Sequence, residues 1–258
     1  MYVISSIACV FGLLLVTSAH ILDDVLLIDG HNDLPNNLYL LLQNNLTNFH
    51  FDKNLTEDEV WGINKCNSCF TDLPRLKKGK VAAQFWVAYV SCAVQYKDAL
   101  GKTIEQIDVI KRLIKKYPKD LVLATTVEDI KKAFVDKKIA SLIGVEGGHS
   151  IDSRLGTLRM YYDLGVRYMT LTHSCNTPWA DNSYVDDSRP VHNLTEFGKL
   201  VVKEMNRLGM LVDLSHVSHN VMNEAIKVSR APVIFSHSAA YDLVPHNRNI
   251  PNDTLLLL

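Results

Sequence analysis

The chain contains 258 residues, which is enough for one large domain or two small ones. Hydrophobic residues make up 47% of the sequence and charged residues 21%, a composition that supports a buried core and excludes a disordered chain. The formal net charge is −1. Because there is neither the basic excess of nucleic-acid-binding proteins nor the acidic run of a solvating tail, we expect no nucleic-acid partner.

The N-terminal segment has the pattern of a targeting sequence. An apolar stretch, Ala8–Val16, is too short to span a bilayer and is followed by the small residues Thr17-Ser18-Ala19. This pattern predicts a signal peptide over residues 1–20, and the alternative is a buried N-terminal strand or helix. We therefore expect one domain over residues 21–258, in the secretory pathway and then extracellular or at the cell surface. No later segment is apolar for long enough to predict a membrane span.

Sequons and cysteines also indicate secretion. Four Asn-x-Ser/Thr sequons predict glycosylation at Asn45, Asn54, Asn193 and Asn252. Without the cysteine of the signal peptide, four remain, at Cys66, Cys69, Cys92 and Cys175. Four cysteines in an oxidising compartment predict disulfides, with three possible connectivities. A zinc ribbon at the Cys-x-x-Cys pair is disfavoured because no second such pair exists.

Apolar runs and amphipathic segments alternate along the chain, which predicts strands and helices in turn. The predicted strands cover residues 25–29, 85–90, 140–145, 168–172, 210–214 and 232–236. The predicted helices cover residues 104–117, 127–138, 153–164, 195–208 and 219–229. Thr103 and Gln106 have the spacing of a capping box at the start of the first helix, Thr126 and Asp129 open the second, and Gly209 ends the fourth. Repeated strand–helix units predict an α/β fold with a parallel sheet and outer helices.

Ligand-type side chains follow four of the predicted strands. His31 and Asp33 are two residues apart after the first strand, Glu146 ends an apolar run, and His216 and His237 follow two later strands. In a βα-barrel these strand ends converge on one face, where active sites lie. Three imidazoles and two carboxylates exceed one tetrahedral structural zinc and fit two metal ions if one carboxylate bridges them. The set predicts metal-assisted hydrolysis, with zinc as the metal and cobalt or manganese as alternatives.

The contexts of these residues resemble the membrane (renal-type) dipeptidases, a family of zinc hydrolases. The matching segments are LIDGHNDLP at 27–35, SLIGVEGGHSID at 141–152, LTHSCNTPWADN at 171–182, LVDLSHVS at 211–218 and APVIFSHSAAY at 231–241. The resemblance implies a TIM-like (β/α)8 barrel with two zinc ions per chain that cleaves dipeptides through a metal-bridging hydroxide. It places His31 and Asp33 on one zinc, His216 and His237 on the other, and Glu146 as the bridge.

The resemblance also implies roles that the residues alone do not reveal. His173 is similar to a substrate-contacting histidine that stabilises the tetrahedral intermediate, and Arg248 is similar to an arginine that binds the substrate's C-terminal carboxylate. Cys92 and Cys175 match a family disulfide, which leaves Cys66 and Cys69 to bond to each other or stay free.

The family pattern continues beyond what this sequence contains. Too few residues follow His237 for two more βα units, so we expect a barrel truncated before its last two strands, the last of which carries a catalytic aspartate in the family. The apolar tail of a glycolipid-anchor signal is also absent, so membrane attachment is expected only in the full-length form. A homodimer stays open.

Two other functions compete with the dipeptidase hypothesis. One is a truncated, non-catalytic secreted glycoprotein that keeps the metal site. The other is a different barrel metallohydrolase, such as a deaminase or lactonase, which the GHNDLP and GVEGGHSID contexts disfavour.

Overall fold

The computed structural model describes residues 21–184 and 193–258. The predicted signal peptide, residues 1–20, lies outside the described residues and stays a prediction. The strands are β1 (Leu27–Asn32), β2 (Val81–Tyr89), β3 (Leu121–Leu123), β4 (Ile139–Glu146), β5 (Val166–Thr170), β6 (Leu211–Asp213) and β7 (Val233–Ile234). The helices are α1 (Leu34–Leu42), α2 (Leu73–Lys78), α3 (Ala99–Lys116), α4 (Val127–Val135), α5 (Leu155–Asp163), α6 (Glu196–Leu208), α7 (His219–Val228) and α8 (Asn252–Leu255).

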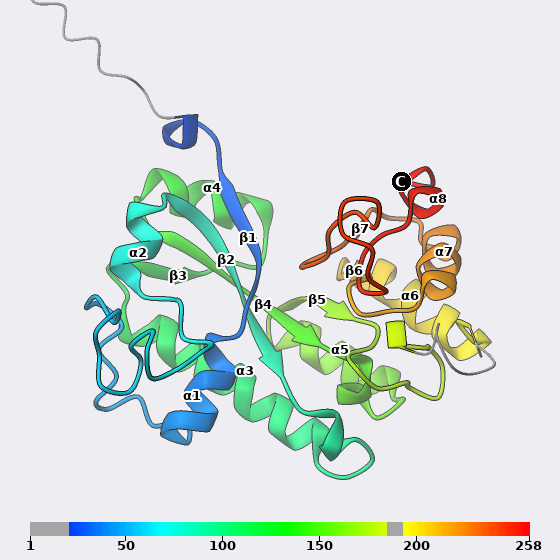
Figure 1. Cartoon of the computed structure of the whole chain (residues 1–258), viewed down its shortest axis with the longest axis horizontal. Coiled ribbons are helices and arrows are strands. Elements are labelled where there is room, and N and C mark those ends of the chain that lie inside the picture. The colour runs from blue at the N-terminus through cyan, green and yellow to red at the C-terminus, as the bar shows by residue number, and fades with distance from the viewer. Residues whose placement is uncertain (1–20, 185–192) are drawn as a thin grey trace, which may run out of the picture.

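The strands form one parallel sheet in the order β1-β2-β4-β5-β6-β7, and β3 pairs with the beginning of β4. Helices follow most strands, and Figure 1 shows the curved sheet running from β1 through β4 and β5 to β7. All the pairings are parallel, as predicted from strands that are apolar on both faces. The fold is a parallel α/β half-barrel, which confirms the expected barrel class and its incompleteness.

Six predicted strands are present, and a seventh was missed. β3 has only three residues, too few for a periodic pattern, and it is recognisable only through its pairing with β4. Helices α1 and α2 were also missed, because each is short and begins with Leu-Pro directly after a polar segment. None of the helices in the described part of the chain is long and apolar enough to cross a membrane.

The helix ends test the predicted caps. Thr126 and Asp129 form a complete capping box at the start of α4, and Gly209 ends α6 in the left-handed conformation, so both predictions are confirmed. The predicted cap at Thr103 is wrong. Helix α3 begins earlier, at Ala99, and the Thr103 hydroxyl lies inside the helix, where it donates to the Ala99 carbonyl (2.7 Å).

Tyr168 fills the inside of the curved sheet. It is fully buried on β5, and its ring packs against Phe85 at a centroid distance of 4.9 Å. On the neighbouring strand β4, a β-carbon at Gly144 would lie 2.3 Å from Tyr168 Cζ, so only glycine leaves room for the ring. The Tyr168 hydroxyl donates to the Gly30 carbonyl (3.1 Å) and thereby ties β5 to β1 across the interior.

The two ends of the sheet approach each other at the carboxyl ends of the strands. A β-carbon at Gly30, in β1, would lie 2.8 Å from the carbonyl oxygen of Ser236, which follows β7. The curvature therefore brings β1 and β7 together on the face where the candidate ligands lie.

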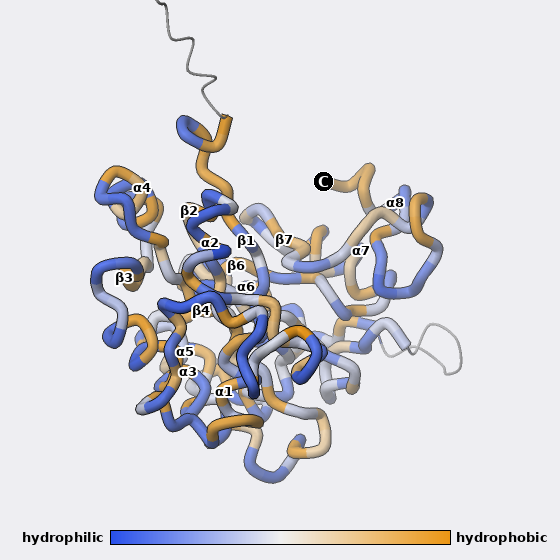
Figure 2. The backbone as a smooth tube through the Cα atoms, turned by 60° about the vertical axis from the view of Figure 1, so that its left-hand side comes forward, coloured by the Kyte–Doolittle hydropathy of each residue, from blue (hydrophilic) through white to orange (hydrophobic). Residues whose placement is uncertain are grey.

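The four leucines 255–258 lie at the end of α8 and beyond it, and they are exposed. Figure 2 shows this hydrophobic segment at the C-terminus.

Gly144→Ala should lower the free energy of unfolding by about 2 kcal/mol or more, because overpacking a rigid core forces side chains out of position. Gly156→Ala is the matched control, since its β-carbon would meet only Arg159, at 4.0 Å, and alanine is favoured in a helix. Urea unfolding of both variants measures the difference. Equal midpoints would contradict the assigned packing of Tyr168.

Candidate metal centre

The carboxyl ends of the strands deliver the candidate ligands to one cavity, as barrel geometry requires. β1 supplies His31, β4 ends in Glu146, and His173, His216 and His237 follow β5, β6 and β7. The cavity has a volume of about 340 Å³ and is lined by His31, Asp33, Asn36, Tyr89, Glu146, His173, His216, His237 and Arg248. All seven predicted metal- and substrate-binding residues therefore lie around one cavity.

Glu146 is the centre of this cluster and is only 3% exposed. Its Oε1 lies 3.0 Å from His216 Nε2 and 3.3 Å from His237 Nε2, whereas its Oε2 lies 3.7 Å from His31 Nε2. His216 Nε2 and His237 Nε2 are 2.9 Å apart. The two carboxylate oxygens thus face different histidines.

Hydroxyl groups behind His237 and His31 fix which ring nitrogen carries the proton. The Ser236 hydroxyl donates to Asp213 Oδ2 (2.7 Å), so it accepts from His237 Nδ1 (2.7 Å). The Tyr168 hydroxyl donates to the Gly30 carbonyl, so it accepts from His31 Nδ1 (3.2 Å). Each Nε2 therefore presents a lone pair to the cluster, which is the tautomer that binds a metal ion.

The protonation states also suit metal binding. Burial raises the pKa of Glu146, but the surrounding histidines outweigh this effect and hold that pKa well below its usual value. Burial lowers the pKa of His216 to about 4. Burial lowers the pKa of His31, but Asp33 and Glu146 outweigh this effect and raise it. The site thus combines a carboxylate whose ionised form is favoured with a His216 imidazole whose neutral form is favoured, and such a pair of acceptors fits a cation.

The side chains of His31 and Asp33 lie close together, although the strand ends between them. Strand β1 ends at Asn32, and Asp33 occupies the N-cap position of α1 with φ −85° and ψ 14°. Its Oδ1 still lies 3.3 Å from His31 Nε2. Asp33 is the most exposed of the candidate ligands, with 48% of its side chain accessible. Glu146 belongs to two groups whose ligand atoms all lie within 4.8 Å of one another, one with His31 and His237 and one with His173 and His216, and Asp33 belongs to neither.

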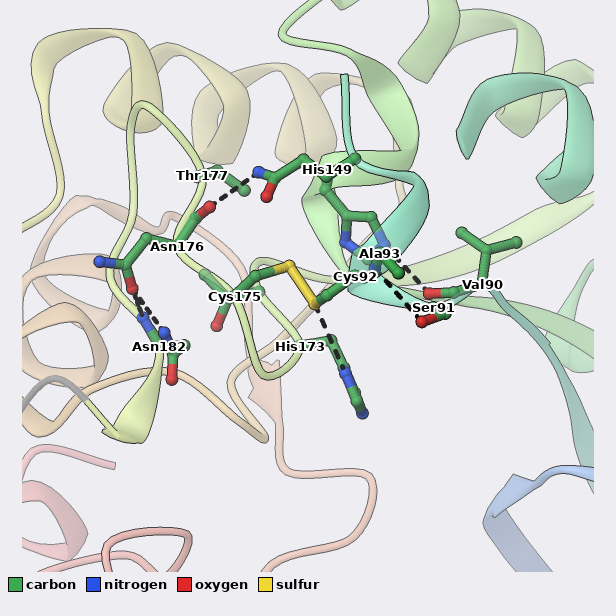
Figure 3. Close-up of a disulfide and its surroundings, with 12 residues drawn as sticks. Val90, Ser91, Cys92, Ala93, His149, His173, Cys175, Asn176, Thr177 and Asn182 are labelled. Atoms are coloured by element: carbon green, nitrogen blue, oxygen red, sulfur yellow. Dashed lines mark hydrogen bonds between the residues drawn. A yellow bond between two sulfur atoms is a disulfide. The ribbon is translucent and has the colours of Figure 1, made fainter. Parts of the chain in front are cut away.

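His173 lies between the cluster and a disulfide. The structure contains a Cys92–Cys175 disulfide, and Figure 3 shows it with His173 and His149 beside it. His173 Nδ1 lies 3.9 Å from Cys92 Sγ, and Nε2 lies 3.9 Å from Glu146 Oε1. The disulfide joins the segment after β2 to the segment after β5, so it fixes the backbone two residues from His173.

Gly147 must be a glycine for these histidines to pack. Its φ is +100°, and a β-carbon there would lie 2.5 Å from the His149 ring and 3.2 Å from His173 Cβ. His149 is buried, and its Nε2 bonds to the Val90 carbonyl (3.0 Å), so it braces the end of β2 instead of entering the cavity. His216 also has a positive φ of 68°, a conformation that is rare for a non-glycine residue.

Arg248 contributes a half-buried cation to the cavity. Its Nη1 lies 3.4 Å from Ser238 Oγ, on the segment that follows β7. Its positive charge contributes to lowering the pKa of both His173 and His216, to which burial contributes most. Arg248 therefore lies on the β5–β7 side of the cluster.

The remaining predicted residues lie away from the cavity. Cys66 and Cys69 form a second disulfide. Asn45, Asn54 and Asn252 are exposed, whereas Asn193 is half-buried and its Oδ1 is shielded from solvent. Glycosylation at the four sequons stays a prediction.

Comparison with known proteins agrees with this geometry. Residues 16–258 match the sequence profile of the membrane dipeptidases, peptidase family M19. The chain belongs to this family. It is 46% identical over 242 residues to dipeptidase 3 of Mus musculus and 44% identical over 242 residues to dipeptidase 3 of Rattus norvegicus. These alignments cover 91% of the chain but only 45% and 46% of the relatives, so it spans about half their length.

Solved structures show the same fold. A metallopeptidase described as dipeptidase AC has a TM-score of 0.73 at 22% identity, covering 90% of this chain and 69% of that one. A metallopeptidase from Rhodobacter sphaeroides, solved with a phosphinate mimic of the dipeptide L-Ala-D-Ala, has a TM-score of 0.71 at 20% identity, covering 90% and 70%. The half-barrel is thus the fold of this membrane dipeptidase family over the part that the chain contains.

The two disulfides of this chain should differ in their effect on stability. Cys92 and Cys175 are 83 positions apart, whereas Cys66 and Cys69 are three apart, and a longer closed loop restricts the unfolded chain more. Replacing Cys92 and Cys175 together by serine should cost about 4–5 kcal/mol, against about 2 kcal/mol for the Cys66/Cys69 pair. Urea unfolding measures both, and equal losses would contradict this loop-length argument.

Proposed function

We propose that this chain carries the metal site of a zinc-dependent dipeptidase, which hydrolyses the peptide bond of dipeptides. The observation that supports this most is the convergence of Glu146 with His31, His216 and His237 at distances of 3.0 to 3.7 Å. Because the relatives are about twice as long, the activity is proposed for the whole protein.

Two zinc ions per chain would share this site. His31 and Asp33 would hold one ion, His216 and His237 the other, and Glu146 would bridge them. The support is that Oε2 of Glu146 faces His31 while Oε1 faces His216 and His237, as a bridging carboxylate requires. When bound, such a pair of ions activates water and polarises a carbonyl group.

The protein's own residues would bind and orient the dipeptide. The Arg248 guanidinium would pair with the substrate's C-terminal carboxylate, which limits the length of peptide that fits. His173 Nε2 faces the cavity beside Glu146 and would stabilise the negative charge that develops on the carbonyl oxygen. The related structure with a phosphinate mimic of L-Ala-D-Ala supports a dipeptide as the substrate.

We also propose that the protein matures in the secretory pathway. The two disulfides support an oxidising compartment. Glycosylation, a glycolipid anchor in the full-length form and a homodimer stay predictions.

Glu146→Gln should reduce the zinc content of the purified protein from two ions to one or fewer, because an amide is a weak zinc ligand and cannot bridge two ions as a carboxylate does. Hydrolysis of Ala-Ala by the full-length product should fall at least a hundredfold and should also be lost after chelation. Glu128→Gln is the matched control, since Glu128 is an exposed residue of α4 outside the metal cavity. Metal analysis and a ninhydrin assay give the two readouts.

Two results would contradict parts of this proposal. Unchanged zinc content in Glu146→Gln would overturn the metal assignment. Full zinc content without hydrolysis of any dipeptide by the full-length product would overturn the dipeptidase function and favour the non-catalytic glycoprotein.

A further inference from the structure

A second cavity adjoins the metal cavity and is called the side pocket here. It has a volume of about 410 Å³, within the usual range for small-molecule sites. Its walls come from α1, the end of β2 and α3, and comprise Asn36, Tyr39, Leu40, Tyr89, Val90, Ser91, Val94, Lys102, Glu105 and Gln106. Asn36 and Tyr89 also line the metal cavity, so the two spaces share a wall.

The walls of the side pocket are mostly apolar. Leu40, Val90 and Val94 contribute aliphatic surface, and the rings of Tyr39 and Tyr89 contribute aromatic surface. Such a surface gains free energy when it excludes water, at about 25 cal/mol per Å² of apolar area. The chemistry of the pocket therefore favours an apolar group.

The charged residues of the side pocket oppose one another. Lys102 donates to the Tyr39 hydroxyl (3.0 Å) and lies over the same ring, 5.1 Å from its centroid. Glu105 is exposed on α3 and carries the opposite charge three positions along the helix. With one cation and one anion together, the pocket has no net charge to select an acidic or a basic ligand.

Polar and aromatic groups form the junction between the two cavities. Asn36 is half-buried, and its side chain makes no hydrogen bond within residues 21–184 and 193–258. Its amide can therefore donate to, or accept from, a peptide backbone that crosses the junction. The Tyr89 ring is already fixed on the other wall, because it packs edge-on against His173 at a centroid distance of 4.8 Å.

The side pocket and Arg248 lie on different sides of the cluster. Arg248 lies beside Ser238, on the segment that follows β7, whereas Asn36 is on α1, directly after β1, and Tyr89 ends β2. A dipeptide with its carboxylate at Arg248 and its carbonyl at the cluster directs its N-terminal residue toward β1 and β2. We propose that the side pocket binds the side chain of this N-terminal residue and selects large apolar side chains, an inference that rests on the proposed function.

Phosphinate pseudo-dipeptides test this proposal without turnover. Three probes share an alanine-like C-terminal half and carry a methyl, a benzyl or a carboxyethyl group as the N-terminal side chain. Calorimetry on the zinc-loaded full-length product should show the benzyl probe binding at least tenfold more tightly than either of the others. Leu40→Asp should reduce this preference to threefold or less and leave the methyl probe unchanged.

Leu41→Asp is the matched control. Leu40 is 64% and Leu41 is 42% exposed on the same helix, but only Leu40 lines the side pocket, so the control should keep the full preference for benzyl. Three results would each contradict the proposed role of the side pocket. The benzyl probe could bind no more tightly than the methyl probe, the carboxyethyl probe could bind most tightly, or Leu40→Asp and Leu41→Asp could have equal effects. Hydrolysis of Ala-Ala by the same preparation distinguishes this proposal from the proposed function. If the protein hydrolyses Ala-Ala but shows no preference for the benzyl probe, only the role of the side pocket is contradicted. If it shows no hydrolysis and no zinc-dependent binding of the probes, both proposals are contradicted.

Discussion

A buried carboxylate surrounded by imidazoles is the constraint on which this structure depends. Glu146 is ionised and almost inaccessible, and burial of a charge is costly unless an opposite charge or strong hydrogen-bond donors compensate it. His31 and His237 cannot be those donors, because their protons are on the outer nitrogens, bonded to Tyr168 and Ser236. Of the three nearest imidazoles only that of His216, whose Nε2 lies 3.0 Å from Glu146 Oε1, is left to donate, so the cluster favours a cation beside the carboxylate.

The same outer groups connect the metal centre to the fold. Tyr168 fills the interior of the half-barrel because Gly144 leaves room for its ring, and its hydroxyl reaches both Gly30 and His31. Burial raises the pKa of Tyr168 well above its usual value, so the phenol keeps its proton and remains a donor at neutral pH. One core side chain thus packs the sheet and selects the tautomer of a ligand.

The sequence predicts much of this arrangement, and the failures have physical reasons. Long apolar runs and ligand-type residues near their ends identify six strands and five of the residues around the cavity, because both patterns are local, whereas His173 and Arg248 were identified only through the family resemblance. β3 was missed because three residues show no period. The start of α3 was missed because the spacing of Thr103 and Gln106 also fits a capping box, although Asp98 is the actual N-cap residue. Tyr168 and Asn36 carry no local signal at all, since their roles arise from contacts between distant strands and helices.

Metal binding at the candidate site would be coupled to folding of this half-barrel. β1 and β7 are the two ends of the strand order and are not paired with each other in the described sheet, yet the rings of His31 and His237 are only 3.9 Å apart. Glu146, on the central strand β4, faces both of them. Ions bound by these three residues would join both ends of the sheet to its middle, so the binding free energy also opposes separation of the ends. The disulfide Cys92–Cys175 restrains the β2 and β5 segments covalently, which leaves β1 and β7 as the parts whose positions depend most on the metal centre.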